Sequence, residues 1–142
     1  MVVVDGQGVP LGSQLTSAAP AEVKLAEPTL NAISVPRAGR GRPQQRPVRV
    51  IADRAYDSDP LRRRLLVRGL LLIVPHRKNR RVPSRNDGRT LRRYRKRWKI
   101  ERTFAWLGNF RRLVVRYDRH LNMYRAFFHI ACALITLRFL PE

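Results

Sequence analysis

Three side chains in the stretch from Thr90 to Leu113 have the types and spacing that metal or phosphate chemistry needs. Tyr94, Arg97 and Glu101 are three and four residues apart, so on a helix they fall on one side. Glu101 is a lone carboxylate among arginines and lysines. It either forms an ordinary ion pair with Arg97, worth a few tenths of a kcal/mol, or binds a metal ion beside a polyanion whose phosphates the arginines hold. Taken alone, the spacing favours the ion pair.

A second carboxylate follows a predicted buried strand. The β-branched run Val48–Ala52 ends directly at Asp53. In α/β sheets, chemistry gathers where strands end and helices begin, and a carboxylate placed there meets a metal ion without being buried unpaired. The alternative is that Asp53 pairs with Arg54 or caps the next turn. Asp57 and Asp59 are predicted to be helix caps.

The elements that position these residues form one α/β domain. A strand, a short helix and a second strand at 48–74 predict a right-handed crossover with parallel pairing. The expected N-terminal elements are strands at 2–4 and 9–15 around a turn at 5–8, a helix at 20–33 that Pro28 kinks or breaks, and a loop at 35–47. A strand at 48–52, a helix capped by Ser58 or Asp59 and ended by Gly69, and a strand at 70–74 follow. A loop at 76–89 and helices at 90–113 and 121–139 complete the chain. The chain divides into a strand pair with a helix (1–33), a basic loop (34–47) and the remainder (48–142).

Apolar residues in the two C-terminal helices recur with helical spacing and are predicted to face the core. They are Ile100, Phe104 and Leu107 in the first helix, and Met123, Phe127, Ile130, Leu134 and Leu137 in the second. The aromatic residues Trp98, Phe104, Trp106 and Phe110 are likewise predicted to be mostly core. Exposed stacking aromatics would instead favour a ribosomal-type RNA-binding protein.

The net charge of +20 is extreme for 142 residues, and the sequence pI is near 11.8. All but four of the 30 basic residues are arginine, whose planar fork binds phosphate well. Residues 1–36 carry a net charge of −2, so residues 37–142 hold +22. This asymmetry predicts a nucleic-acid partner, with a membrane surface a distant second.

Other features exclude several classes of protein. The single cysteine, Cys132, excludes a disulfide framework and a cysteine zinc site. The opening MVVVDGQG lacks the regions of a signal peptide, and Ala126–Leu140 is too short to span a bilayer. The protein is therefore expected in the cytoplasm, with no membrane partner.

Several motifs together carry a family resemblance. They are ADRAYDS from Ala52, PHRKN from Pro75 and YRKRWKIERTFAWLGNFRRL from Tyr94, supported by VDGQGVPL near the start. With them the chain resembles the DDE transposases of bacterial insertion sequences, and most of all the IS-five group within the IS-four-like assemblage. The spacing of Tyr94, Arg97 and Glu101 matches that assemblage's Tyr-two-Arg-three-Glu motif.

The resemblance implies a ribonuclease-H-like fold and metal-dependent phosphoryl transfer on DNA ends. Asp53 would be the second acidic residue of the triad and Glu101 the third, and together they would be the catalytic residues and ligands of Mg²⁺ or Mn²⁺. The residues expected to bind DNA are Tyr94, Arg97, Arg102, Arg111 and Arg112. Where the family motif has a lysine this chain has Gly108, and on a continued helix Arg112 returns to the same face.

The resemblance places the family's first acidic residue upstream of VDGQGVPL. Asp5 is predicted to be a turn residue, so the chain is expected to lack the first strand and the first acidic residue. It would then be a C-terminal portion, either a decayed copy or a downstream-frame product, inactive without an upstream transposase half or a full-length transposase. The rival hypotheses are a non-catalytic basic DNA-binding remnant and, last, the RNA-binding protein.

Overall fold

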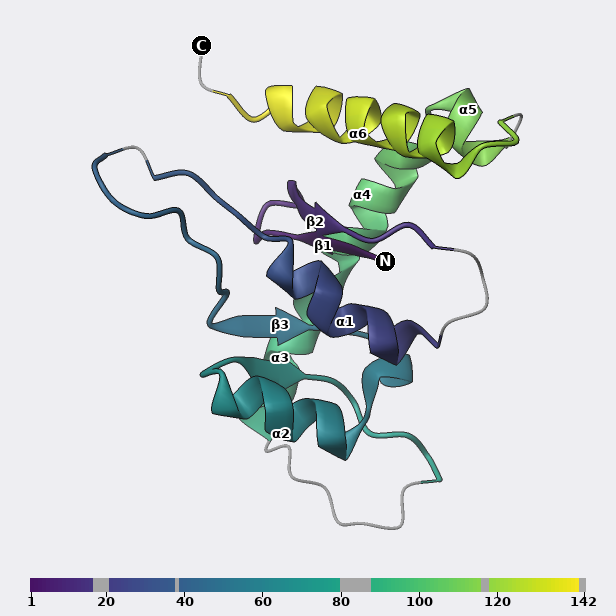
Figure 1. The fold of residues 1–142 in the computed structure, drawn as a ribbon. Coiled ribbons are helices and arrows are strands. Elements are labelled where there is room, and N and C mark those ends of the chain that lie inside the picture. The colour runs from purple at the N-terminus through teal and green to yellow at the C-terminus, as the bar shows by residue number, and fades with distance from the viewer. Residues whose placement is uncertain (17–20, 38, 80–87, 116–117, 141–142) are drawn as a thin grey trace.

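The computed structural model describes residues 1–16, 21–37, 39–79, 88–115 and 118–140 (Figure 1). Its elements are β1 (Val2–Val4), β2 (Pro10–Ser13), α1 (Glu22–Asn31), β3 (Arg49–Ile51), the 3₁₀ turn η1 (Arg54–Tyr56), α2 (Asp59–Val67), β4 (Leu71–Ile73), α3 (Gly88–Tyr94), the 3₁₀ turn η2 (Arg95–Arg97), α4 (Trp98–Gly108), α5 (Arg111–Val114) and α6 (Leu121–Leu137). The result is a mixed α/β fold, as predicted.

The N-terminal hairpin forms around a turn that Asp5 organises. Strands β1 and β2 pair antiparallel, with Val2 opposite Ser13. The Asp5 carboxylate accepts hydrogen bonds from the backbone N–H groups of Gln7, at 2.7 Å, and Val9, at 2.9 Å. Asp5 is therefore a turn residue, and that prediction is confirmed.

The strand–helix–strand unit is also confirmed. Strands β3 and β4 pair parallel, with Arg49 opposite Leu71. Helix α2 between them begins where the Ser58 hydroxyl accepts a hydrogen bond from the Leu61 N–H. After the helix, Gly69 takes a φ of +74°, a left-handed conformation that glycine adopts without strain.

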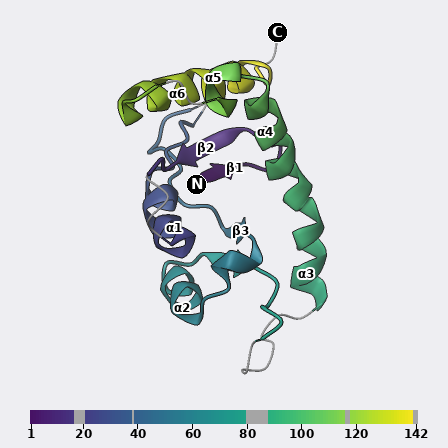
Figure 2. The same cartoon turned by 90° about the vertical axis from the view of Figure 1, so that its right-hand side faces the viewer.

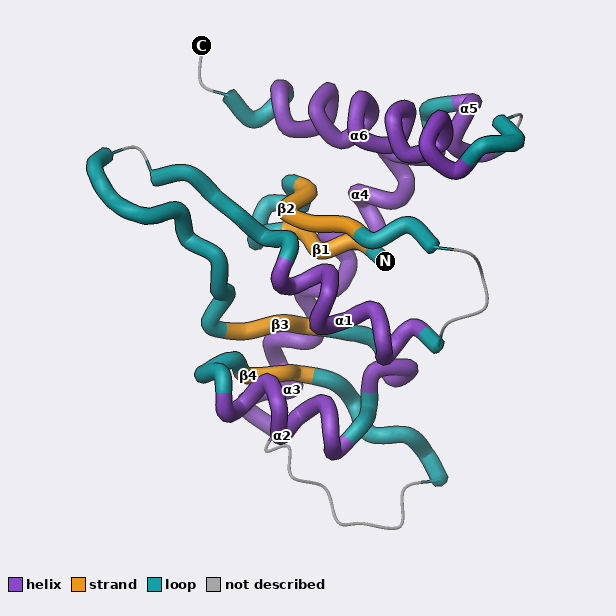
Figure 3. Tube along the Cα trace, viewed as in Figure 1, coloured by secondary structure: helices purple, strands orange, loops and turns teal. Residues whose placement is uncertain are grey.

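The four strands make two separate pairs within the described residues, β1 with β2 and β3 with β4. Figures 2 and 3 show the strands in one layer, with α1 and α2 on one side and the column of α3 and α4 on the other. A cavity of about 650 Å³ lies between the pairs, lined by β1, by β3 and by Ile100 and Phe104 of α4. Phe104 faces this cavity and is half-exposed, so its assignment to the core was wrong.

Two clusters of buried apolar side chains hold the elements together. The larger joins α1, α2 and β4 through residues such as Leu30, Leu61 and Leu72. The smaller joins α4 to α6 through Leu107, Phe128 and neighbouring residues of α6. Helix α4 is therefore fixed at its C-terminal end by α6.

Two helix boundaries differ from the prediction. The expected helix at 90–113 contains the 3₁₀ turn η2 and ends at Gly108, after which α5 is a separate short helix. Glycine so near a helix end favours termination. Helix α1, in contrast, continues through Pro28. The fully buried Thr29 and Leu30 hold this last turn in place, and the Thr29 hydroxyl donates to the Leu25 carbonyl at 2.7 Å.

The buried face of α6 was also predicted wrongly. The side chains inside are Phe128, Ala131 and Ile135, whereas the large residues predicted to be core are at least partly exposed. The exposed ones are Met123, Ile130, Leu134 and Leu137, and Phe127 is partly buried. Because apolar residues surround most of this helix, their period does not select one face, and only one face meets α4.

No helix in the described residues is long and apolar enough to cross a membrane.

The turn at Gly8 supplies a test of this packing. Gly8 has a φ of +92°, and a Cβ added there would meet the Thr103 hydroxyl oxygen at 3.0 Å and the Lys99 carbonyl oxygen at 3.3 Å. We expect Gly8→Ala to lower the free energy of unfolding by about 1–3 kcal/mol, measured by thermal denaturation followed by circular dichroism. Gly6→Ala is the matched control, because a Cβ at Gly6 meets nothing within 4 Å. Equal melting temperatures for the two variants would contradict the described packing.

Candidate active site

Asp53 and Glu101 come from different elements and face each other at the edge of the fold. Asp53 directly precedes η1, where its carboxylate accepts a hydrogen bond from the Arg54 N–H. Glu101 lies in the first turn of α4. The side chain of Asp53 is 48% exposed and that of Glu101 is 62% exposed, so both carboxylates remain hydrated and open to a ligand.

The Arg97 guanidinium bridges the two carboxylates. One of its terminal nitrogens lies 3.3 Å from Asp53 Oδ2 and 3.4 Å from Glu101 Oε1, so those two oxygens are no farther apart than the sum of these distances. The other terminal nitrogen donates to the Tyr94 hydroxyl at 2.7 Å. The hydrogen bond to Tyr94, together with the nearby carboxylates, raises the pKa of Arg97. The structure thus brings Tyr94, Arg97, Glu101 and Asp53 into one constellation.

The constellation offers two hard oxygen donors, which suit Mg²⁺ or Mn²⁺. The predicted ion pair between Arg97 and Glu101 is also present, so the two interpretations of Glu101 are not exclusive. Within the described residues, no group of three or more His, Cys, Asp or Glu side chains is placed to share a metal ion. Asp5 lines the nearby cavity, but its carboxylate is engaged in the hairpin turn.

Three side chains of α4 fix this helix against the hairpin. Lys99 donates to the Gly6 carbonyl, Arg102 donates to the Gln7 carbonyl, and the buried Thr103 hydroxyl donates to the Gly8 carbonyl at 2.6 Å. Successive carbonyls of one turn thus meet one face of the helix. These contacts, with Arg97, set the position of Glu101 relative to β3.

Arg102, Arg111 and Arg112, which the sequence predicts to bind DNA, lie apart from the carboxylates' bridge. The Arg102 guanidinium lies over the rings of Trp98 and Trp106, 4.8 Å from each centroid. Arg111 is exposed on α5. Arg112 also belongs to α5, 3.9 Å from Asp118 and over the Phe127 ring. Because α4 ends at Gly108, the expectation that Arg112 shares the Glu101 face was wrong.

The sequence did not predict that the carboxylate of Asp57, near the site, is buried. Asp57 was predicted to be a helix cap, but its side chain is only 2% exposed and accepts hydrogen bonds from Arg62, at 3.0 Å, and from the Arg77 backbone N–H, at 2.9 Å. His76 Nδ1 lies 3.3 Å away. Burial alone would raise the pKa of Asp57, but these hydrogen bonds outweigh it and lower the pKa. No periodicity marks Asp57, because its partners lie within α2 and in the loop after β4.

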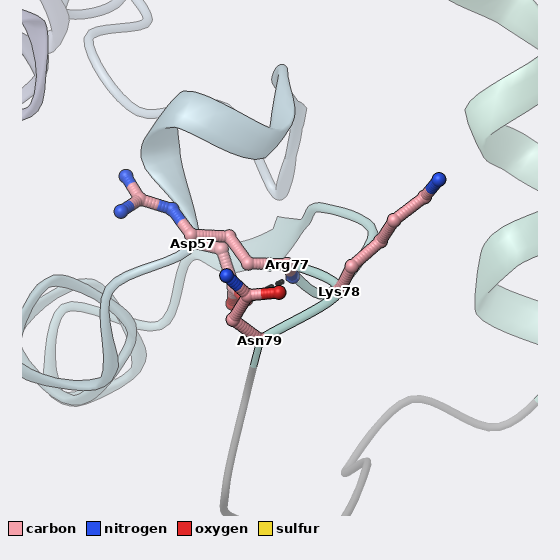
Figure 4. Close-up of a pocket in the computed structure, with 4 residues that line it drawn as sticks. All are labelled: Asp57, Arg77, Lys78 and Asn79. Atoms are coloured by element: carbon pink, nitrogen blue, oxygen red, sulfur yellow. Dashed lines mark hydrogen bonds between the residues drawn. The ribbon is translucent and has the colours of Figure 1, made fainter.

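The loops that follow β3 and β4 hold each other through this carboxylate. Arg77, whose N–H binds Asp57, donates from its side chain to the carbonyls of Arg54, at 3.3 Å, and Ala55, at 2.9 Å. Figure 4 shows Asp57 and Arg77 together, with the Lys78 side chain extending away from them. Arg77 therefore holds the turn directly after Asp53.

Known proteins are similar to this chain over most of its length. The family model of the transposase DDE domain matches residues 1–136, so the chain belongs to the DDE transposase family. A Burkholderia cepacia protein named "Putative transposase for insertion sequence element IS402" is 41% identical over 140 residues, which are 96% of this chain and 63% of that relative. A Brucella ovis protein named "Putative transposase for insertion sequence element IS6501" is 37% identical over 91 residues, or 63% of this chain and 67% of the relative. No solved structure matches.

The Asp57 cluster predicts a specific response to mutation and pH. Asp57→Ala removes the carboxylate partner of the mostly buried Arg62 and should cost about 3–5 kcal/mol of stability. Asp57 has a folded pKa below its ordinary value, so its stabilisation is complete above that ordinary value, near pH 4, and is lost as pH falls through the lowered pKa.

Urea denaturation at several pH values measures both effects. In Asp57→Asn, the part of the acid destabilisation that comes from this carboxylate should disappear, and Asp59→Asn at the start of α2 should keep it. An unchanged acid limb in Asp57→Asn would show that the cluster does not stabilise the fold.

Proposed function

We propose that this chain supplies the second and third acidic residues, Asp53 and Glu101, for metal-dependent phosphoryl transfer on DNA ends during transposition. The observation that carries the proposal is the shared Arg97 bridge, which holds two exposed carboxylates from different elements close together. A structural ion pair alone needs only one carboxylate. Two carboxylates around one removable cation make a site that a divalent ion can also occupy.

In this proposal each residue of the constellation has a role. Asp53 and Glu101 would hold Mg²⁺ or Mn²⁺, which activates the attacking oxygen and stabilises the leaving oxygen when bound. Arg97 and Tyr94 would position the phosphate backbone, since Arg97 can turn one donor from a carboxylate to a phosphate oxygen. That Arg102, Arg111 and Arg112 bind DNA stays a prediction.

We further propose a ribonuclease-H-like sheet of the IS-five type whose first strand and first acidic residue this chain lacks. Support comes from the space between the strand pairs. Every second residue along a strand bonds to the same neighbouring strand. Along β1 the residues that bond to β2 begin with Met1, and along β3 those that bond to β4 begin with Val48. Val2 and Val4 on one side, and Arg49 and Ile51 on the other, therefore direct backbone N–H and C=O groups to the cavity.

The chain covers 63% of the length of its Burkholderia relative, so the activity of a whole transposase is proposed from a part. An upstream transposase half, or a full-length copy, would be the partner that completes the acidic triad. The second candidate function is a DNA-binding protein without catalysis. The described residues favour it in one respect, since they place only two acidic residues at the site.

Both candidates require DNA binding, which the distribution of charge supports. Arg92 and Arg93 of α3 and Arg95 and Lys96 of η2 are exposed on the helix column that leads to Glu101. These exposed cations thus precede Glu101 along the column of α3 and α4, whose course Figure 2 shows. Phosphate contacts by such residues release counterions from DNA, which makes the affinity depend on salt.

We expect the chain to bind duplex DNA with little sequence preference and a steep salt dependence. Affinity should fall by about 10³–10⁵ between 50 and 200 mM salt if six to ten phosphates are contacted. A filter-binding titration at several salt concentrations measures the slope. Replacing Arg92, Arg93, Arg95 and Lys96 by glutamine should reduce it, and a flat response in the unmodified chain would contradict DNA binding.

We expect the chain alone not to nick DNA. With two carboxylates in place of three, one of two metal ions would lack a ligand, and the attacking and leaving oxygens would not be held together. The assay is conversion of supercoiled plasmid to open circles with Mg²⁺ or Mn²⁺, beside an Asp53→Ala control. Nicking that the control abolishes would overturn this expectation and make Asp5 the leading candidate for the third ligand.

A further inference from the structure

A basic loop joins α1 to β3 and takes no part in the Arg97 bridge. Residues 34–47 contain four arginines and no acidic residue. Residues 39–46 are exposed, and Figure 1 shows the loop reaching beyond the neighbouring strands and helices. Four positive charges thus stand away from the fold, where they add repulsion rather than stability.

The base of this loop is closed by a short antiparallel pairing. The Val35 N–H donates to the Gln44 carbonyl at 3.0 Å, and the Gln44 N–H donates to the Val35 carbonyl at 2.8 Å. Pro36 and Pro43 lie directly inside this pair. Each proline fixes its own φ and restricts the preceding residue to extended conformations. The end of the loop therefore has less conformational freedom than an open loop of the same length.

At the end of the loop a glycine separates two arginines. We call residues 39–43, Gly-Arg-Gly-Arg-Pro, the loop tip. Gly41 has a φ of +145°, which favours glycine, and a Cβ added there would lie 3.6 Å from Arg37 Cδ. Within the described residues, no ion pair or side-chain hydrogen bond holds Arg40 or Arg42. The tip is thus a thin stretch of backbone with an unengaged guanidinium before and after it.

This shape distinguishes between the surfaces of DNA. Arginine reaches phosphates from any exposed surface, with no need of a glycine between two arginines. The major groove is about 12 Å wide and admits a helix, whereas the minor groove is only about 6 Å wide. At A·T pairs the minor groove has a strong negative potential that attracts arginine, and no guanine amino group projects from its floor. A backbone without a Cβ, flanked by two arginines, matches such a groove.

We propose that the loop tip binds in the minor groove of A·T-rich duplex DNA, with Gly41 at the groove floor and Arg40 and Arg42 extending along the groove. This inference rests on the proposed function, and it adds a second DNA contact outside the carboxylate site. Minor-groove contacts separate A·T from G·C pairs but not A·T from T·A. The preference is therefore one of composition, which is compatible with little dependence on the exact base sequence.

The experiment compares three 20-base-pair duplexes whose six central base pairs are all A·T, all G·C or all inosine·cytosine. Inosine is guanosine without its 2-amino group. An inosine·cytosine pair therefore has the major-groove groups of G·C and the minor-groove groups of A·T. The unmodified chain is titrated with each duplex at the same salt concentration, followed by the fluorescence anisotropy of a label on one DNA end. The three duplexes carry the same phosphates, so they differ only in their grooves.

Minor-groove binding predicts similar affinities for the A·T and inosine·cytosine duplexes, about 5- to 150-fold tighter than for the G·C duplex. Arg42→Gln should remove most of this preference. Arg46→Gln is its matched control, because it removes the same charge from an exposed position of the same loop outside the tip. It should weaken binding of all three duplexes alike.

Gly41→Ala tests the tip without a change of charge. A methyl group there would stand between the backbone and the groove floor, so the preference should fall while the salt dependence of binding stays the same. Gly39→Ala is the control and should keep the preference, since a Cβ at Gly39 meets nothing within 4 Å. Both glycines are exposed, so both variants should keep the melting temperature of the unmodified chain.

Three results would overturn the inference. Equal binding of the A·T and G·C duplexes would show that the loop contacts phosphates alone. An inosine·cytosine duplex that binds as weakly as G·C would place the contact in the major groove, and a preference that survives in both Arg42→Gln and Gly41→Ala would assign it to another part of the chain. In each case salt-dependent binding of duplex DNA would leave the proposed function standing. Failure of all three duplexes to bind would instead contradict the proposed function, and the minor-groove inference with it.

Discussion

The candidate site depends on one interaction, the bridge that Arg97 makes between Asp53 and Glu101. Two carboxylates at this separation repel each other unless a cation lies between them. Arg97 supplies that cation, and the Tyr94 hydroxyl orients its guanidinium. The bridge also joins the end of β3 to the start of α4. The bridge therefore sets the position of the two acidic residues relative to each other.

The Arg97 bridge can be exposed to solvent because other contacts hold α4 in place. The helix is fixed to the hairpin turn through Lys99, Arg102 and Thr103, and its far end is buried against α6. An exposed ion pair contributes little to stability, about 0–1 kcal/mol. The Arg97 bridge can therefore be exchanged for contacts with a metal ion or a phosphate without loosening the helix, which a functional site requires.

The sequence predicted those features that depend on contacts between neighbouring residues, and it failed for those that depend on contacts between distant ones. The Asp5 turn, the cap at Ser58 (one of two residues predicted for it) and the helix end at Gly69 depend on a few neighbouring residues, and the structure confirms them. The proximity of Asp53 and Glu101 followed from the family resemblance rather than from periodicity. The buried face of α6 and the cluster around Asp57 depend on partners distant in sequence. Trp98, predicted to be mostly core, is half-exposed, because a helical period does not by itself say which face of the helix meets the core.

The arginines of the chain fall into two groups, and the distinction explains why the charge is a functional signal. Arg62, Arg77 and Arg102 donate to backbone carbonyls, so they serve the fold. Such uses need few residues, whereas residues 37–142 carry a net charge of +22. Like charges at this density destabilise a compact state. The arginines that bind backbone carbonyls do not need the remaining basic residues for their contacts. A polyanion removes that repulsion on binding. The surplus is therefore better explained by a DNA partner than by the stability of the protein alone.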